Sequence, residues 1–274
     1  MTSTRFSWFA ASTASFAALS LLTAPAVSAM PAPTGQGTTH VTAEASRWVT
    51  PRSAPANDTQ IAPRSVSAAA EAAVLAADFT SIFTDQVPAL SDAGWAACPS
   101  PITWSVDTAG LSEAEAAEQI ANLQWAFDQW SQASGLAFQF AGTSALVYDD
   151  GSFTLAPADG SPAASRNIYL DFIPDSASAR LGGGVVGLAS PSSVWQNSKE
   201  IVAGTAVFRL DYVASASSDQ DQALYLHELG HVLGLGHATQ PGNRMYAMVK
   251  DDTVLGAGDV GGVRSMLKPC TEGA

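Results

Sequence analysis

The chain has 274 residues, 47% of them hydrophobic and 14% charged, which suits one large folded domain or two small ones. Its 12 lysines and arginines stand against 25 aspartates and glutamates, a net charge of −13 at neutral pH. Such an acidic chain is not expected to bind nucleic acid or an anionic membrane surface, and we interpret its acidity as favouring solubility.

The first 29 residues have the pattern of a secretory signal peptide. Arg5 precedes an apolar, alanine-rich run that extends to about Leu22, and Val27 and Ala29 are small residues of the kind that a signal peptidase recognises. We therefore predict cleavage after Ala29 and a secreted, extracellular protein. A membrane anchor is the alternative, but the apolar run is short and is interrupted by serine and threonine.

Residues 30–97 are rich in Ala, Pro, Ser and Thr and have little apolar periodicity, as in "TPRSAPANDTQIAPRS". This composition fits a propeptide that is removed after export, and it fits a disordered linker equally well. Both interpretations stay open. The ordered domain is expected at 98–274.

A strand pattern at 102–107 and a helix pattern at 111–135 open the ordered region. Ser112 and Glu115 have the spacing of a capping box, and Gly135 is a natural helix stop. One apolar stripe of this helix is expected in the core: Ile120, Leu123, Phe127 and Trp130. Short strands are expected next, at 136–140, 145–148, 167–172, 185–190 and 204–211. Two helices should follow, one from Ser218 or Asp219 and one at 256–267.

Three of the chain's four histidines lie in the stretch "HELGHVLGLGH". His227 and His231 share one face of the expected helix, which is the spacing that a single zinc ion requires. Gly234 can adopt backbone angles that end the helix and turn the chain, so that His237 reaches the same ion. Three neutral imidazoles leave a coordination position for water, as in catalytic zinc sites, and Glu228 can contact that water without being a ligand.

The pattern HExxHxxGxxH followed by a methionine resembles the metzincin signature. Met245, in "HATQPGNRMYA", resembles the methionine turn of the matrixin branch, and the resemblance implies that it packs beneath the zinc ligands. The likeness extends more weakly over about 98–270. It implies a zincin-like α+β fold, in which a twisted, mostly parallel mixed sheet lies under two long helices and a small C-terminal subdomain follows Gly234.

The chain departs from the matrixin pattern in three places. Ala247 stands where a proline usually follows Met–Tyr, which leaves the wall of the specificity pocket undefined. Of the histidines that would bind a structural zinc only His40 is present, so one zinc per chain is expected. Residues 30–97 contain no cysteine, so the family's cysteine latency switch is not expected.

Taken together, the motif and the export signal predict a secreted zinc endopeptidase. Zinc is expected to polarise the scissile carbonyl, while Glu228 takes a proton from the attacking water and passes it to the leaving amine. By resemblance, the substrate would add as an extended strand to one edge of the sheet. That edge comprises Val185, Val186, Gly187, Leu188 and Ala189. The alternatives are a secreted binding or adhesion module that keeps zinc without turnover, and a zinc enzyme acting on a non-peptide amide or ester.

Cys98 and Cys270 are the only cysteines, and a disulfide between them is the default in an exported protein. The alternative is a free Cys98 thiol that reaches the zinc, but "WAACPSP" does not match the family's switch motif. Residues 148–151, Asp171 and Asp175 offer calcium ligands without forming a calcium-loop pattern, and solvated turns are the preferred interpretation. We expect a monomer whose partner is a protein or peptide substrate.

Overall fold

The computed structural model describes residues 38–39, 44–47, 73, 76–182, 184–249 and 253–270. For residues 38–39 and 44–47 the structure describes the backbone alone. The signal peptide predicted at 1–29 and most of the segment expected to be a propeptide or linker lie outside the described residues. No helix in the described part of the chain is long and apolar enough to span a membrane.

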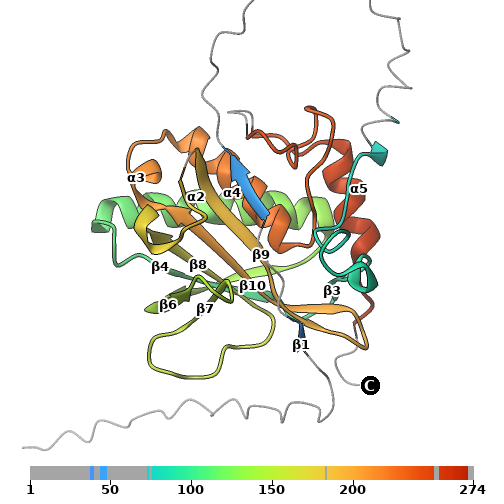
Figure 1. Cartoon of the computed structure of the whole chain (residues 1–274), viewed down its shortest axis with the longest axis horizontal. Coiled ribbons are helices and arrows are strands. Elements are labelled where there is room, and N and C mark those ends of the chain that lie inside the picture. Colours follow the sequence, from blue (N-terminus) through green and yellow to red (C-terminus); the bar gives the residue numbers. More distant parts are fainter. Residues whose placement is uncertain are drawn as a thin grey trace, which may run out of the picture. The chain divides into compact units, whose positions relative to one another are not determined.

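Eight strands of the described residues form one mixed sheet: β1 (Thr38–Thr39), β2 (Glu44–Arg47), β3 (Gly94–Trp95), β4 (Ile102–Asp107), β5 (Phe138–Thr143), β8 (Asn167–Ile173), β9 (Val185–Trp195) and β10 (Glu200–Arg209). Their order is β1-β9-β10-β8-β4-β5, with β2 also paired to β9 and β3 to β10 (Figure 1). β8 runs parallel to both β10 and β4, and β4 runs parallel to β5. Only β9 runs against the other strands, so its pairs with β10, β1 and β2 are antiparallel and the rest of the sheet is parallel, as expected.

The first long helix, α2 (Glu113–Ser134), begins at the predicted capping box. The Ser112 hydroxyl accepts a hydrogen bond from the Glu115 N–H at 3.4 Å, and the Glu115 carboxylate accepts one from the Ser112 N–H at 2.8 Å. The helix ends at Gly135, whose φ of +81° lies in the left-handed region. Its apolar stripe enters the hydrophobic core through Leu123, Phe127 and Trp130, with Ile120 partly buried against it.

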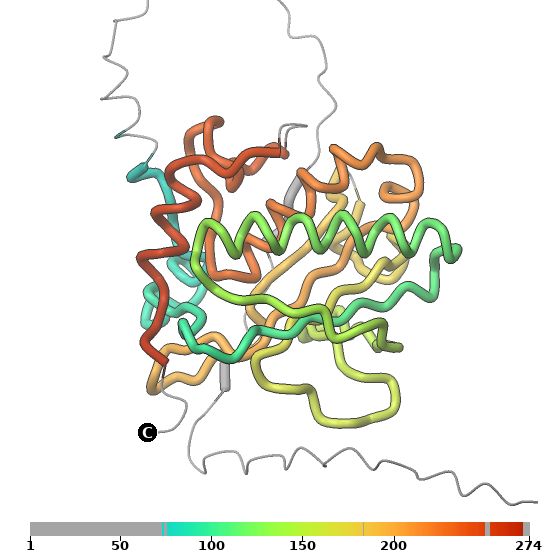
Figure 2. The backbone as a smooth tube through the Cα atoms, turned by 180° about the vertical axis from the view of Figure 1, so that it is seen from behind, coloured from blue at the N-terminus to red at the C-terminus, as the bar shows by residue number. Residues whose placement is uncertain are grey.

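The second long helix, α4 (Ser218–Val232), packs against α2, the long green helix that crosses the domain in Figure 2. The Trp130 indole N–H donates to the Leu226 carbonyl at 2.9 Å, and the Gln119 amide donates to the Asp221 carboxylate at 2.8 Å. α4 also packs on β9 and β10. It is therefore held between α2 and the sheet, which fixes the position of every side chain on its inner face.

Smaller elements complete the domain. β6 (Leu146–Asp149) pairs with β7 (Thr154–Pro157) in a separate antiparallel hairpin, and α5 (Ala257–Met266) is the last helix. Two 3-10 turns, η1 (Pro88–Leu90) and η2 (Asp175–Ala177), and the short α3 (Leu210–Val213) lie in connections. The sequence predicts β6 and α5 but not β7, which is short and ends in a proline.

The packed core extends N-terminal of the boundary that the sequence predicts at residue 98. Ile82, Phe83 and Trp95 are at most 1% exposed and belong to the main hydrophobic core. The Trp95 indole N–H donates to the Val232 carbonyl, at the end of α4, at 3.0 Å. These residues lie in turns and in the two-residue β3, so their spacing follows neither a helical nor a strand period. That irregular spacing explains why the sequence assigns them to the linker.

The two ends of the core meet at the disulfide. Cys98 and Cys270 are bonded to each other, with their Cα atoms 4.8 Å apart. The Lys268 N–H donates to the Trp95 carbonyl at 3.0 Å, and the Ala97 N–H donates to the Lys268 carbonyl at 2.9 Å. The chain entering the domain is therefore paired to the segment that leaves α5.

Candidate metal centre

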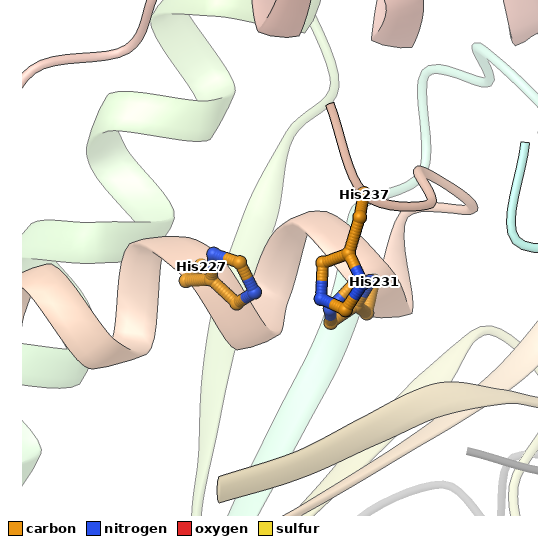
Figure 3. A group of neighbouring side chains, drawn as sticks. All are labelled: His227, His231 and His237. Carbon is orange, nitrogen blue, oxygen red and sulfur yellow. The ribbon is translucent and has the colours of Figure 1, made fainter. Parts of the chain in front are cut away.

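Three histidine side chains converge beside the C-terminal end of α4 (Figure 3). His227 and His231 lie on the helix, and His237 follows the turn at Gly234, whose φ is +102°. The three available ring nitrogens lie within 4.8 Å of one another. The predicted motif thus forms one cluster, and Gly234 has the positive φ that the expected turn requires.

The two helical histidines are oriented by backbone carbonyls. His227 Nδ1 lies 2.8 Å from the Arg244 carbonyl, and His231 Nδ1 lies 2.8 Å from the Leu235 carbonyl. With Nδ1 as the donor, the lone pair of each Nε2 is available to a metal. Nε2 of His227 is fully buried without a hydrogen-bond partner, as expected for a ligand atom. The set fits zinc, which binds imidazole nitrogen in three-histidine sites.

Burial keeps these imidazoles neutral. Desolvation, assisted by the nearby His237, lowers the pKa of His227 to about 3. Desolvation and the two neighbouring histidines hold the pKa of His231 well below its usual value, and desolvation also lowers the pKa of His237. A neutral imidazole is the form that binds a metal, so the site is in its ligating form at neutral pH.

Glu228 lies beside His227 on α4, is fully buried, and faces β9. A Cβ built at Gly187 would come within 2.5 Å of Glu228 Oε1. The residues expected to form the substrate edge, Val185 to Ala189, make up the first half of β9. The structure thus brings this strand against the glutamate.

The outer side of this part of β9 is paired with β2. The two strands run antiparallel, with Ser46 opposite Gly187 and Glu44 opposite Ala189. β9 is consequently an interior strand of the sheet in the full chain, flanked by β10 on one side and by β1 and β2 on the other. The edge expected from the sequence is free only in a chain from which β2 has moved away.

Met245 is buried against Gly230 of α4, next in sequence to His231. It is 1% exposed, and its sulfur occupies the space that a side chain at Gly230 would need. The turn that contains Arg244 and Met245 is fixed by Asp259 of α5. The Asp259 carboxylate accepts hydrogen bonds from the N–H groups of Arg244 at 2.6 Å and Met245 at 3.0 Å. Since the Arg244 carbonyl orients His227, Asp259 supports a ligand through this turn. Nothing in "GAGDVGG" distinguishes Asp259, and the sequence does not reveal its role.

The acidic residues that could serve as calcium ligands are engaged in separate interactions. Asp150 pairs with Arg180 at 2.9 Å, and Asp149 accepts hydrogen bonds from the Gly151 N–H and the Ser152 hydroxyl. Asp171 is half-buried near Asp107, and desolvation together with that neighbour raises its pKa to about 7. Among the described residues, the histidine trio is the group of acidic, cysteine and histidine side chains that converges as a metal site would.

Comparison with protein families agrees with this geometry. Residues 192–268 match the matrixin family model, a segment that includes α4, all three histidines, Met245 and α5. No curated protein matches the chain. The match covers the metal centre and leaves β4, α2 and β8 outside it. Residues 192–268, which carry the metal centre, are therefore matrixin-like.

Proposed function

We propose that this protein is a secreted zinc endopeptidase that uses Glu228 as its general acid and base. The observation that carries the proposal is the convergence of three neutral histidines, two buried on α4 and one half-buried after it, beside the buried Glu228 of the same helix. The matrixin match supports metalloprotease chemistry and a protein or peptide as substrate. The export signal in the first 29 residues supports secretion.

His227, His231 and His237 would hold the zinc. When bound, the zinc would polarise the scissile carbonyl and promote ionisation of the attacking water. Glu228 Oε1 and Oε2 would accept the proton of that water and deliver it to the leaving amine. Burial of Glu228 against β9 restricts its carboxylate to one place, which favours transfer between positions fixed by the fold.

The substrate is proposed to bind as an extended strand along Val185 to Ala189. The pairing of β2 with β9 supports this, because it places an extended segment antiparallel to the same five residues. Main-chain hydrogen bonds would then give affinity that depends little on sequence. Since β2 and a substrate would compete for one strand, we propose that the segment carrying β2 is a propeptide that must leave β9 before substrates bind.

A secreted zinc-binding module without turnover is the competing function. Zinc binding requires no carboxylate at position 228, and a buried acid without a chemical role would cost stability. The position of Glu228 against Gly187 favours the enzyme.

The proposal is tested on the secreted protein by measuring its zinc content, its mature N-terminus and its cleavage of a mixed peptide library. We expect one zinc per chain and cleavage that stops with a chelator and returns when zinc is added. A zinc-loaded protein that cleaves no peptide, even after its N-terminal segment has been trimmed, would support the binding module instead.

A further inference from the structure

The loop that carries His237 is paired along its length with a segment from far earlier in the chain. The Ile82 N–H donates to the Gly234 carbonyl at 2.9 Å, and the Gly236 N–H donates to the Thr80 carbonyl at 2.9 Å. The Thr80 hydroxyl donates to the carbonyl of His237 itself at 2.9 Å. The third ligand is therefore held through its backbone by residues more than 150 positions away.

Asp78 holds the next part of the same loop. Its Oδ1 accepts hydrogen bonds from the Thr239 N–H at 2.9 Å and the Thr239 hydroxyl at 2.7 Å. Its Oδ2 accepts from the Gln240 N–H at 2.7 Å and from the Asn243 amide at 2.9 Å. Desolvation opposes the charge, but these bonds together lower the pKa of Asp78, so the carboxylate is ionised at neutral pH.

The segment itself is anchored in the core. Ile82 and Phe83 are at most 1% exposed. Phe79 packs against Gly262 of α5, where a Cβ would come within 2.8 Å of its ring. A Cβ at Gly236 would come within 2.6 Å of Thr80 Oγ1, so the two backbones approach closely. Movement of residues 78–82 would thus be transmitted to the His237 loop.

We infer that Asp78 and Thr80 are positioning residues that fix His237 as the third metal ligand. The two helical ligands are oriented by the carbonyls of Leu235 and Arg244, whereas the place of His237 depends on the loop that Asp78 and Thr80 hold. The inference rests on the proposed zinc site. It also implies that any maturation cleavage lies before Asp78, since a cut after Thr80 would remove both residues.

Metal binding tests this in the full chain. We compare Asp78→Ala, Thr80→Val and Thr80→Ser with Asp85→Asn, an exposed acid of the same segment that serves as the matched control. Zinc release to a chromophoric chelator is timed, and the visible absorption of the cobalt-substituted protein reports the ligand geometry. Loss of residues that support metal ligands typically costs 10–100-fold in metal affinity, so Asp78→Ala should release zinc roughly 10-fold faster or more.

Thr80→Val should release zinc a few-fold faster and change the cobalt spectrum in the same direction as Asp78→Ala. Thr80→Ser keeps the hydroxyl, so its zinc release and cobalt spectrum should match those of the unmodified protein. These outcomes separate positioning from a purely structural role, which would lower the melting temperature and leave the cobalt spectrum unchanged. Zinc release and cobalt spectra that match Asp85→Asn in both Asp78→Ala and Thr80→Val would overturn the inference. Neither readout needs turnover, so failure of the proposed peptidase activity would be seen separately.

Discussion

The carboxylate of Glu228 occupies the space that a side chain at Gly187 would fill. A Cβ at Gly187 would lie 2.5 Å from Oε1 and 2.8 Å from Cδ of Glu228, much closer than real atoms approach. Glycine at this position of β9 therefore lets the strand pass directly over the Glu228 carboxylate. The absence of one methyl group at Gly187 thus lets β9 and Glu228 come together.

Gly187→Ala should consequently lower turnover while the zinc stays bound. The added methyl group must displace either β9 or the Glu228 carboxylate, and a misplacement of about 1 Å can cost roughly 100-fold in rate. The matched control is Gly204→Ala, whose methyl group would clash with Val232 of α4 at 2.5 Å, away from Glu228. Steady-state kinetics and zinc analysis distinguish the two variants. Equal losses of kcat in both would contradict a specific role for the contact between Gly187 and Glu228.

Glu228→Gln should retain zinc and lose nearly all activity, because the amide cannot carry the proton and no ligand is changed. A general acid–base group is typically worth about 100- to 10,000-fold in rate. Glu113→Gln, which changes an exposed acid at the start of α2, is the control. Peptide cleavage near the rate of the unmodified protein would show that Glu228 is not the proton carrier.

The metal-free protein should lose stability as the pH falls from about 6.5 towards 3. The pKa of His227 is lowered to about 3 in the folded state, so between these values the unfolded chain binds the proton and the folded chain does not. The contribution of His227 to the free energy of unfolding decreases by up to about 1.4 kcal/mol for each unit by which the pH falls. That contribution is fully present above the pKa of the histidine in the unfolded chain.

Two desolvated acids, the half-buried Asp171 and the buried Asp221, change stability in the opposite sense over part of this range. Desolvation raises the pKa of Asp171 and of Asp221 to about 7, so each stabilises the fold at acidic pH relative to neutral pH. The measurement is therefore the difference between the protein and His227→Gln, by urea unfolding with a chelator at several pH values. If that difference does not vary with pH, the histidine is not buried as a neutral group.

Disruption of β2 should expose β9 to solvent. Ala45→Pro combined with Ser46→Pro places proline in the strand, where it removes a hydrogen-bond donor and breaks pairing. Hydrogen–deuterium exchange of residues 185–189 should become faster, and added peptide substrates should be cleaved faster. The double substitution Ser53→Pro and Ala54→Pro, in the proline-containing sequence "PRSAPA" that follows β2, is the control. Unchanged exchange in β9 would argue against the proposed propeptide.

The helix that carries the metal site could be predicted because its sequence pattern is local. The three histidines, Glu228 and Gly234 follow from helical spacing and from the conformational freedom of glycine, and the structure brings them together as predicted. The capping box at Ser112 is local in the same way. Family resemblance adds the place of Met245, which spacing alone does not give.

Residues that act on the site from a distance could not be found this way. Asp78 is a single acid in an alanine-rich stretch and Asp259 one in a glycine-rich stretch, and each acts through backbone N–H groups of another segment. Such bonds leave no period or motif in the sequence. The core residues around Phe83 and Trp95 were missed for a related reason, since they pack from irregular backbone. Long-range pairing, rather than local pattern, determines these parts of the fold.

The bond between Cys98 and Cys270 also determines what a break in the chain would do. All residues of the loop 158–165 are exposed, and this loop lies between the two cysteines in sequence. A protease that cuts there would leave one fragment with α2 and another with the metal centre, still joined through sulfur. The link keeps the fragments at high effective concentration, and the buried contact between Trp130 and Leu226 holds them in register. The nicked protein should run as one band without reductant and as two with it, and should function as a two-chain molecule.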